Sequence, residues 1–254
     1  GAPDGMAAFP GQDGLTVLVR NHELSPGAND DGAFGGKLER LEKLNTDLLY
    51  DRGHGTTPGL GGTTTVHVDT RTGEVKRQFM SLAGTTRNCA GGPTPWNTWL
   101  TCEETVQKAD DQCEKDHGFV FEVPASATGL VTPVALTDMG RFNHEAVAVD
   151  PQSGCVYLTE DRHDGLFYRF IPNVKGAMHE GGRLQALCFK DRPSADARNW
   201  DQDIQVNVGE RVVVEWMDVT DPLSPDDDMR FVGFEAGAAR FARGEGMWWG
   251  NGSV

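Results

Sequence analysis

Acidic side chains recur at matching places in this sequence, and one cysteine takes the place of an acid. They flank four segments with a shared order: a small or polar start, a short strand, a tight turn and a second strand. The flanking residues are Asp4 and Glu23, Cys89 and Glu103 or Glu104, Glu145 and Glu160 or Asp161, and finally Glu245. Carboxylates held close together cannot all stay ionised unless cations neutralise them. These residues therefore predict a metal site.

The cysteine narrows the choice of metal. Oxygen ligands suit Ca²⁺, whereas a thiolate suits a transition metal such as iron, so the combination indicates a mixed cluster. Cys89 lies in a segment rich in glycine and proline, whereas Cys155 and Cys188 have the apolar surroundings of core residues. Cys102 and Cys113 bracket a short polar stretch and could form a loop disulfide if the protein is exported. Cys89 is thus the candidate thiolate ligand.

β-Hairpins would place these residues together. The segments run over residues 4–23, 89–104 and 145–161, and a fourth begins at residue 245. The turns QDG, QSG and GNG are typical of hairpins, and the second strands LTVLV, TWL and CVYL are rich in β-branched and aromatic residues. In a hairpin the first residue of one strand and the last of the other lie at the same end. We therefore expect the acids to converge at one mouth of a channel lined by the first strands.

The wider pattern predicts an all-β protein of the β-propeller class. Each complete unit continues through a variable loop to a strand that begins with glycine, at Gly61, Gly118 and Gly165, and VHVDTRTGEV and RVVVEW also read as strands. Only residues 37–49 look helical, as an insertion. Repeated antiparallel sheets of three or four strands favour a propeller over a sandwich or barrel. We expect one incomplete propeller domain over residues 1–254, truncated at both ends.

Composition excludes some partners. The 254 residues carry a formal net charge of -15, which argues against binding to a nucleic-acid backbone. No apolar run approaches the roughly 20 residues of a membrane-spanning helix, so no membrane association is expected. The first residues show no secretory signal. We expect a monomer.

Several segments carry a family likeness. They are RNHE (20–23), RNCAGGPTPWNTWLTCEE (87–104), RFNHEAVAVDP (141–151), VYLTEDR (156–162), FYRF (167–170) and ARGEGMWW (242–249). Together they resemble the PhoX family of alkaline phosphatases. The resemblance implies a six-bladed propeller that hydrolyses small phosphate esters at a cluster of Fe³⁺ and Ca²⁺ bridged by an oxo group. It also implies export to the periplasm or the cell exterior.

The resemblance assigns roles to individual residues. Cys89 would ligate iron, with Glu145 and Glu245 as further ligands of the cluster, while Asn21 and Arg243 would contact the phosphate. Calcium ions would be held by Glu23, Glu103, Glu104 and Glu160, and the repeat adds Asp4 as a metal ligand. Metal ions can neutralise the phosphoryl oxygens and supply a nucleophile, and arginine pairs with phosphate through two hydrogen bonds.

Two other functions fit part of the pattern. A calcium-dependent, lactonase-like propeller would use the acids but leave Cys89 and Arg243 without roles, and a non-catalytic binding propeller would use calcium only for rigidity. Among the histidines, His22 and His144 are expected to orient or pack beside key acids. The other histidines, His54, His67, His117, His163 and His179, lack ligand spacing and are expected at the surface. Residues 226–228 read as a solvated acidic loop.

Overall fold

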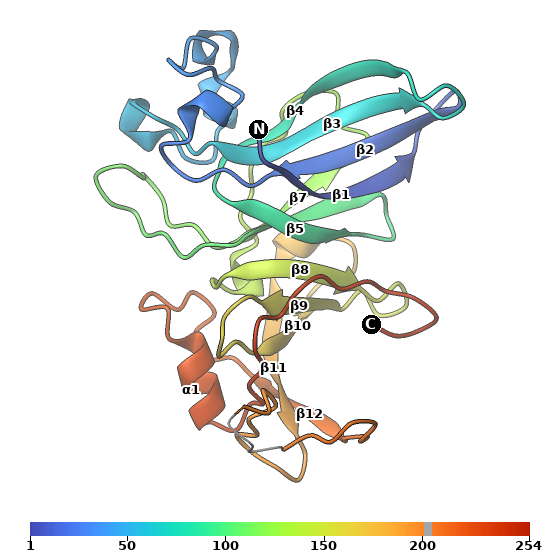
Figure 1. Cartoon of the computed structure of the whole chain (residues 1–254), viewed down its shortest axis with the longest axis vertical. Helices are drawn as coiled ribbons and strands as arrows, with labels where there is room; N and C mark the ends of the chain where they lie inside the picture. The colour runs from blue at the N-terminus through green and yellow to red at the C-terminus, as the bar shows by residue number, and fades with distance from the viewer. Residues whose placement is uncertain (201–204) are drawn as a thin grey trace.

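Three antiparallel sheets form the body of the protein in a computed structural model that describes residues 1–200 and 205–254 (Figure 1). The first sheet has β1 (Pro3–Pro10), β2 (Leu15–His22), β3 (Gly61–Asp69) and β4 (Val75–Thr85) in sequence order. The second has β5 (Asn88–Pro93), β6 (Thr98–Glu103) and β7 (Val120–Pro124). The third has β8 (His144–Val149), β9 (Val156–Glu160), β10 (Phe167–Pro172), β11 (Gly182–Phe189) and β12 (Val214–Asp218).

Helices are short. The one α-helix among the described residues is α1 (Met229–Glu235). Single turns of 3-10 helix cover Asn29–Asp31, Leu41–Lys43, Thr46–Leu48, Gly53–Gly55, Thr137–Met139 and Met178–Glu180. None of the helices in the described part of the chain approaches the length needed to cross a membrane.

The three complete hairpins predicted from the sequence are confirmed as β1–β2, β5–β6 and β8–β9. Their third strands, β3, β7 and β10, also form where the glycine-led segments were expected. The first turn depends on Gly14, whose φ of 77° lies in the left-handed region that glycine adopts at no steric cost. Antiparallel order within each sheet and a common hairpin at its inner edge confirm the expected propeller architecture.

The structure adds detail at three places. The fourth segment, which begins at residue 245, forms only an isolated bridge between Gly250 and Ser253, as expected of a unit that starts but does not complete a hairpin. Residues 37–49 form separate 3-10 turns, since Leu38 adopts a φ of 57° and Asn45 accepts a hydrogen bond from the Asp47 amide. All five cysteines are free thiols, so the Cys102–Cys113 disulfide, which the sequence left open, is not formed in the structure.

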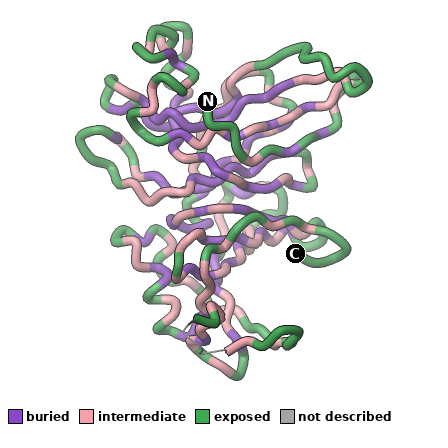
Figure 2. Tube along the Cα trace, viewed as in Figure 1, coloured by how far each residue is buried: buried purple, intermediate pink, exposed green. Residues whose placement is uncertain are grey.

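Apolar side chains fill the spaces between neighbouring sheets. One core cluster joins the first and second sheets through residues that include Val19, Trp99 and Phe121. A larger one joins the second and third sheets and includes Leu100 and Leu158. These side chains are at most 2% exposed, and fully burying one side chain of this kind contributes roughly 1.5–3 kcal/mol. Figure 2 shows the buried residues concentrated along the strands and the exposed ones in the loops.

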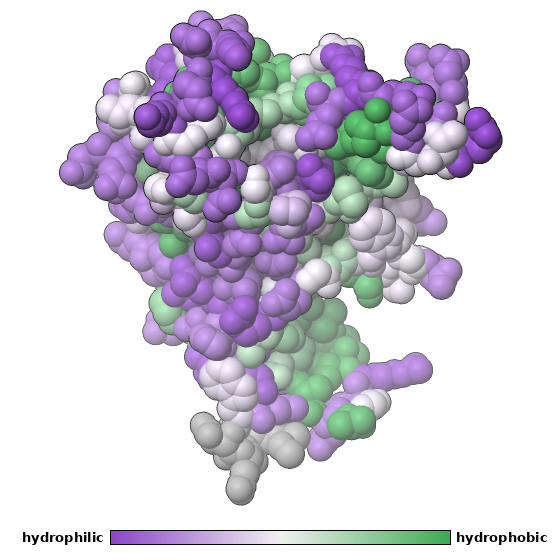
Figure 3. All heavy atoms as spheres, turned by 45° about the horizontal axis from the view of Figure 1, so that its top comes forward, coloured by the Kyte–Doolittle hydropathy of each residue, from purple (hydrophilic) through white to green (hydrophobic). Residues whose placement is uncertain are grey.

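The inner strands of the sheets lie side by side. β1 packs against β5, and β5 packs against β8 (Figure 1). The approach of β1 to β5 is close enough that a Cβ on Gly5 would lie 2.7 Å from the Ala90 Cα, so only glycine fits there. On the face drawn in Figure 3 hydrophilic residues cover most of the surface, in keeping with the acidic composition.

Candidate metal centre

A β-bulge recurs near the start of each inner strand. The pairing register shifts between Pro3 and Met6 in β1, between Asn88 and Gly91 in β5, and between His144 and Val147 in β8. The residues inside these bulges include Asp4, Cys89 and Glu145, which occupy the same position in their hairpins. Bulges re-aim side chains and are frequent beside active sites. The same backbone feature therefore presents one candidate ligand from each sheet.

A matching hydrogen bond fixes the second candidate ligand of each hairpin. The amides of Glu23, Glu104 and Asp161 donate to the carbonyl oxygens of Ala2, Arg87 and Asn143, at 2.9, 2.9 and 3.0 Å. Each acceptor lies two residues before the bulged residue of its own hairpin. Each donor is the first residue after the second strand. The pairs Asp4–Glu23, Cys89–Glu104 and Glu145–Asp161 are thus structurally equivalent.

The pairs of the second and third sheets converge. Cys89, Glu104 and Glu145 each offer one ligand atom, and these atoms all lie within 4.8 Å of one another. Cys89 is 3% exposed, and its thiol donates to the His144 carbonyl oxygen at 3.2 Å. One sulfur and two carboxylates at this spacing are a donor set for a transition metal with mixed ligands.

The C-terminal segment brings two further predicted residues to the same place. The Gly244 amide donates to the Glu160 carbonyl oxygen at 3.2 Å, and the Glu245 carbonyl oxygen accepts from the Thr159 hydroxyl at 3.0 Å. These bonds hold Arg243 and Glu245 beside the end of β9. The Arg243 guanidinium forms two hydrogen bonds with Asp161, and its Nη2 lies 3.8 Å from a Glu245 oxygen.

Two arginines partly balance the acids. Arg87 Nη2 lies 3.0 Å from a Glu23 oxygen and 2.5 Å from a Glu104 oxygen, so it joins the first hairpin to the second. Arg87 and Arg243 have φ angles of 50° and 53°, the left-handed region that costs a residue with a side chain about 1–3 kcal/mol. Such strain is typical of functional sites. The two cations are still outnumbered by the carboxylates of this group, which are Asp4, Glu23, Glu104, Glu145, Asp161 and Glu245.

Proton affinities reflect this excess of acid. Burial, with the nearby charges of Glu104, Glu245 and Asp161, raises the pKa of Glu145 to about 7. Burial also raises the pKa of Glu104, although Arg87 opposes the shift. Burial and the neighbouring Glu145 raise the pKa of the Cys89 thiol well above its usual range. A bound cation would reverse these shifts by favouring the ionised forms.

Two predicted calcium ligands point elsewhere. Glu103 is completely buried, and its carboxylate accepts from the amides of Thr86, Gly118 and Phe119 and lies 2.6 Å from His117 Nδ1. Glu160 is 1% exposed; one of its oxygens accepts from the Leu166 amide and the Tyr168 hydroxyl. The structure groups neither carboxylate with Cys89.

Asn21, a predicted phosphate contact, is also fully buried. Its Nδ2 donates to the carbonyl oxygens of Cys89 and Ala90 at 3.1 and 2.8 Å. Its Oδ1 accepts from Trp99 Nε1 and the Thr101 hydroxyl, both at 2.8 Å. With its amide engaged in this way, Asn21 ties β2 to the bulge that carries Cys89.

The repeat left the choice between Glu160 and Asp161 open, the family resemblance assigned a role only to Glu160, and neither included Arg87. When the ends of the second strands (NHE, CEE and TED) are aligned, their last two residues fall into two columns of equivalent positions. His22, Glu103 and Glu160 end their strands, and the next column contains Glu23, Glu104 and Asp161. Successive side chains of a strand point to opposite sides, so that alignment could have selected Asp161. No comparable signal marked Arg87.

Two histidines have the contacts that the sequence predicts, and a third does not lie where it was expected. His144 is buried, stacks on Phe142 with ring centroids 3.6 Å apart, and has its pKa lowered to about 4 by burial. His22 contacts Gly1 and Thr64, so both have the packing or orienting contacts expected of them. His117 is completely buried, so its expected surface position was wrong.

Comparisons with known proteins agree with the fold. A family model described as alkaline phosphatase PhoX matches residues 1–254, whereas a search of curated proteins finds no match. The solved structure of Pseudomonas fluorescens PhoX in complex with vanadate, a transition state analogue, is similar, with a TM-score of 0.62 and 18% identity. The similarity covers 98% of this chain and 56% of that one, so this chain spans about half of its length. The chain belongs to the PhoX alkaline phosphatase family.

Proposed function

We propose that Cys89, Glu104, Glu145 and the acids around them, here called the channel cluster, bind metal ions and take part in the hydrolysis of phosphate esters. The observation that carries the proposal is the convergence of Cys89, Glu104 and Glu145 within 4.8 Å, on equivalent positions of two hairpins. Family membership supports the reaction class. Among the functions considered, only this one gives roles to both Cys89 and Arg243.

The donor atoms fit the metals that the family resemblance implies. Cys89, Glu104 and Glu145 would hold Fe³⁺, because a thiolate beside carboxylates suits a transition metal. Ca²⁺ would be held by the more peripheral oxygen donors, Asp4, Glu23, Asp161 and Glu245. The surplus of carboxylates over arginines supports this fit, since buried acids need compensating cations.

The bound ions would neutralise phosphoryl oxygens and activate a nucleophile. Arg243 would orient the ester, since Asp161 engages its Nε and Nη2 while half of the side chain remains exposed to substrate. Arg87 would hold Glu23 and Glu104 in place, because the same guanidinium nitrogen lies beside both carboxylates. Asn21 would position the Cys89 bulge through its two donated hydrogen bonds, in place of a direct phosphate contact.

The proposal also covers the domain organisation, the substrate class, the location and the oligomeric state of the protein. Residues 1–254 would act as one propeller domain, since the inner strands β1, β5 and β8 pack in series. Family membership supports small phosphate esters as substrates and a location in the periplasm or outside the cell. A monomer agrees with the acidic surface, since its charges repel those of a second copy.

Hydrolysis of p-nitrophenyl phosphate by the purified chain, with and without chelator, tests the proposal. Cys89→Ser and Glu145→Gln should each lose bound metal and lower kcat by at least about tenfold, whereas the matched control Cys155→Ser should do neither. Elemental analysis separates the alternatives: iron with calcium supports this function, and calcium alone favours the lactonase-like or binding propeller. Full metal content and activity in Cys89→Ser would refute the ligand assignment.

A further inference from the structure

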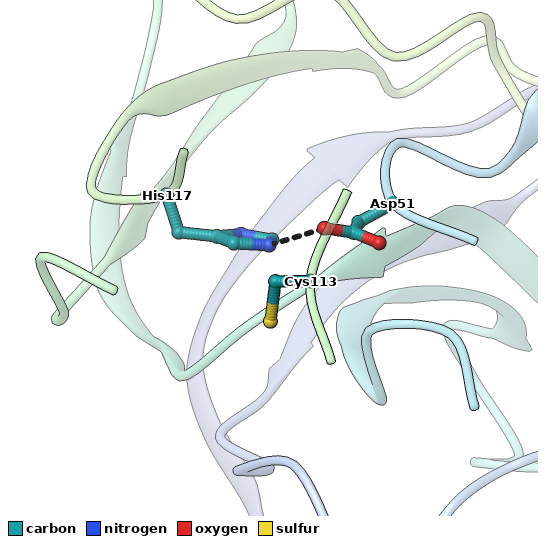
Figure 4. Close-up of side chains that lie close together, drawn as sticks. All are labelled: Asp51, Cys113 and His117. Carbon is teal, nitrogen blue, oxygen red and sulfur yellow. Dashed lines mark hydrogen bonds and ion pairs between the residues drawn. The ribbon is translucent and has the colours of Figure 1, made fainter. Parts of the chain in front are cut away.

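A second group of metal-binding side chains lies outside the channel cluster. Asp51 precedes the Gly53–Gly55 turn, while Cys113 and His117 lie in the connection between β6 and β7. Figure 4 shows the His117 ring directed at Asp51, with the Cys113 side chain next to them. We propose that these three residues bind a divalent transition metal ion of the Zn²⁺ type, independently of the function proposed above.

The donor set and its spacing carry the inference. One ligand atom from each residue lies within 4.8 Å of the other two, and His117 Nε2 is 3.2 Å from Asp51 Oδ2. The residues are 1%, 7% and 0% exposed for Asp51, Cys113 and His117. One nitrogen, one sulfur and one carboxylate oxygen suit Zn²⁺, which takes four ligands at about 2.0–2.3 Å. Small shifts of the side chains would bring them to that distance.

Neighbouring groups already fix the orientation of two proposed ligands, His117 and Asp51. Glu103 lies 2.6 Å from His117 Nδ1, which leaves Nε2 to face Asp51 and Cys113. A carboxylate behind a ligating histidine is the usual outer partner at such sites. The Asp51 carboxylate accepts from the Gly53, Glu114 and Lys115 amides at 2.7, 3.2 and 3.0 Å. Its position is therefore set by the backbone.

Access and a fourth ligand are also available. A cavity of about 200 Å³ is lined by Asp51 and Cys113 together with Thr56, Pro58 and Gln112. A water molecule needs a share of about 30 Å³, so a metal-bound water has room there. The same cavity gives an ion a route from solvent, which a buried site requires.

A buried ion pair is the alternative use of these residues. Burial by itself lowers the pKa of His117, but the neighbouring Glu103 and Asp51 carboxylates raise it to about 10. His117 would then be a cation between two carboxylates. The ion pair involves only His117, Glu103 and Asp51, so it does not explain why the Cys113 thiol lies beside them. A divalent ion that displaces the imidazolium proton and the thiol proton leaves the net charge of the group unchanged. A bound metal ion therefore gives Asp51, Cys113 and His117 each a role as ligand and adds no net charge to the buried group.

Cobalt is a suitable probe, because thiolate-bound Co²⁺ absorbs in the near ultraviolet. The titration should be made on the full chain carrying Cys89→Ser, which removes the channel thiol. We expect a thiolate band in that parent, a loss of the band and at least a tenfold loss of cobalt affinity on adding Cys113→Ser, and no change on adding Cys155→Ser. Absence of the band from the parent, or its persistence with Cys113→Ser, would overturn the site.

A second measurement needs no substitution. Alkylation of each cysteine in the unaltered chain can be followed by peptide mass analysis with and without Zn²⁺. Zinc should slow modification of Cys113 at least tenfold and leave the partly exposed Cys155 unaffected. Equal rates at Cys113 with and without Zn²⁺ would contradict the inference. Because neither readout depends on phosphate-ester hydrolysis, a failed activity assay leaves this test intact.

Discussion

Glu103 and Glu104 are neighbours in sequence, yet the structure predicts very different losses of stability on replacing them. Glu103 is completely buried, and both of its oxygens accept hydrogen bonds from protein donors. In Glu103→Gln the new NH₂ group must face at least one of those donors, and His117 loses a charged partner. Unpaired buried groups cost about 1–3 kcal/mol each, and breaking a buried pair costs about 3–5 kcal/mol. We expect the free energy of unfolding to fall by about 3–5 kcal/mol.

Glu104→Gln is the matched comparison. The Glu104 side chain is 15% exposed and pairs with Arg87, but it also lies against the like charge of Asp161. Loss of the ion pair is offset by relief of that repulsion, so we expect a change of less than about 1 kcal/mol. Urea denaturation of both variants in the presence of chelator measures the difference. A loss below about 1 kcal/mol for Glu103→Gln, or similar losses for both, would refute the division of these residues into structural and site roles.

Three further predictions concern other parts of the chain. Asn21→Ala should lower the free energy of unfolding by about 3 kcal/mol or more in urea, because four partners, three of them buried, lose their hydrogen bonds; a change under about 1 kcal/mol would contradict its bridging role. Arg198, and then Arg240, hold the pKa of Asp196 well below its ordinary 3.8, so this acid stabilises the fold above about pH 4 and the contribution is lost as the pH falls further. Asp196→Asn should therefore flatten the acid limb of a plot of stability against pH, and an unchanged limb would count against the ion pair. Arg243→Met should raise KM for p-nitrophenyl phosphate at least about tenfold with metal content unchanged, and loss of metal instead would make the residue structural.

The hairpins were accessible from sequence because each feature is local. The turns QDG and QSG, followed by β-branched strands, predict β1–β2 and β8–β9 without knowledge of the rest of the chain. Their repetition also predicts that the bulged residues Asp4, Cys89 and Glu145 occupy equivalent places. What it left open was the choice within Glu103–Glu104 and Glu160–Asp161, which depends on the side to which each side chain points.

Long-range contacts account for two of the remaining differences, at His117 and Arg87. His117 is buried because Asp51, distant in sequence, reaches it across the loops, and nothing near residue 117 signals that meeting. Arg87 enters the site by bridging Glu23 and Glu104, which come from different hairpins. Local composition cannot anticipate these two long-range contacts. The structure of residues 37–49 has a local cause instead: their composition is helical, but the left-handed Leu38 and the Asn45 cap divide them into short turns.

X-ray absorption at the iron edge reports the atoms bound to the metal, so it examines the proposed metal centre itself. We expect iron in the purified chain with one sulfur neighbour among oxygen ligands. That sulfur should disappear in Cys89→Ser and remain in Cys113→Ser. Iron surrounded by oxygen and nitrogen alone, or a sulfur neighbour that survives Cys89→Ser, would contradict the assignment of Cys89, Glu104 and Glu145 as the metal centre.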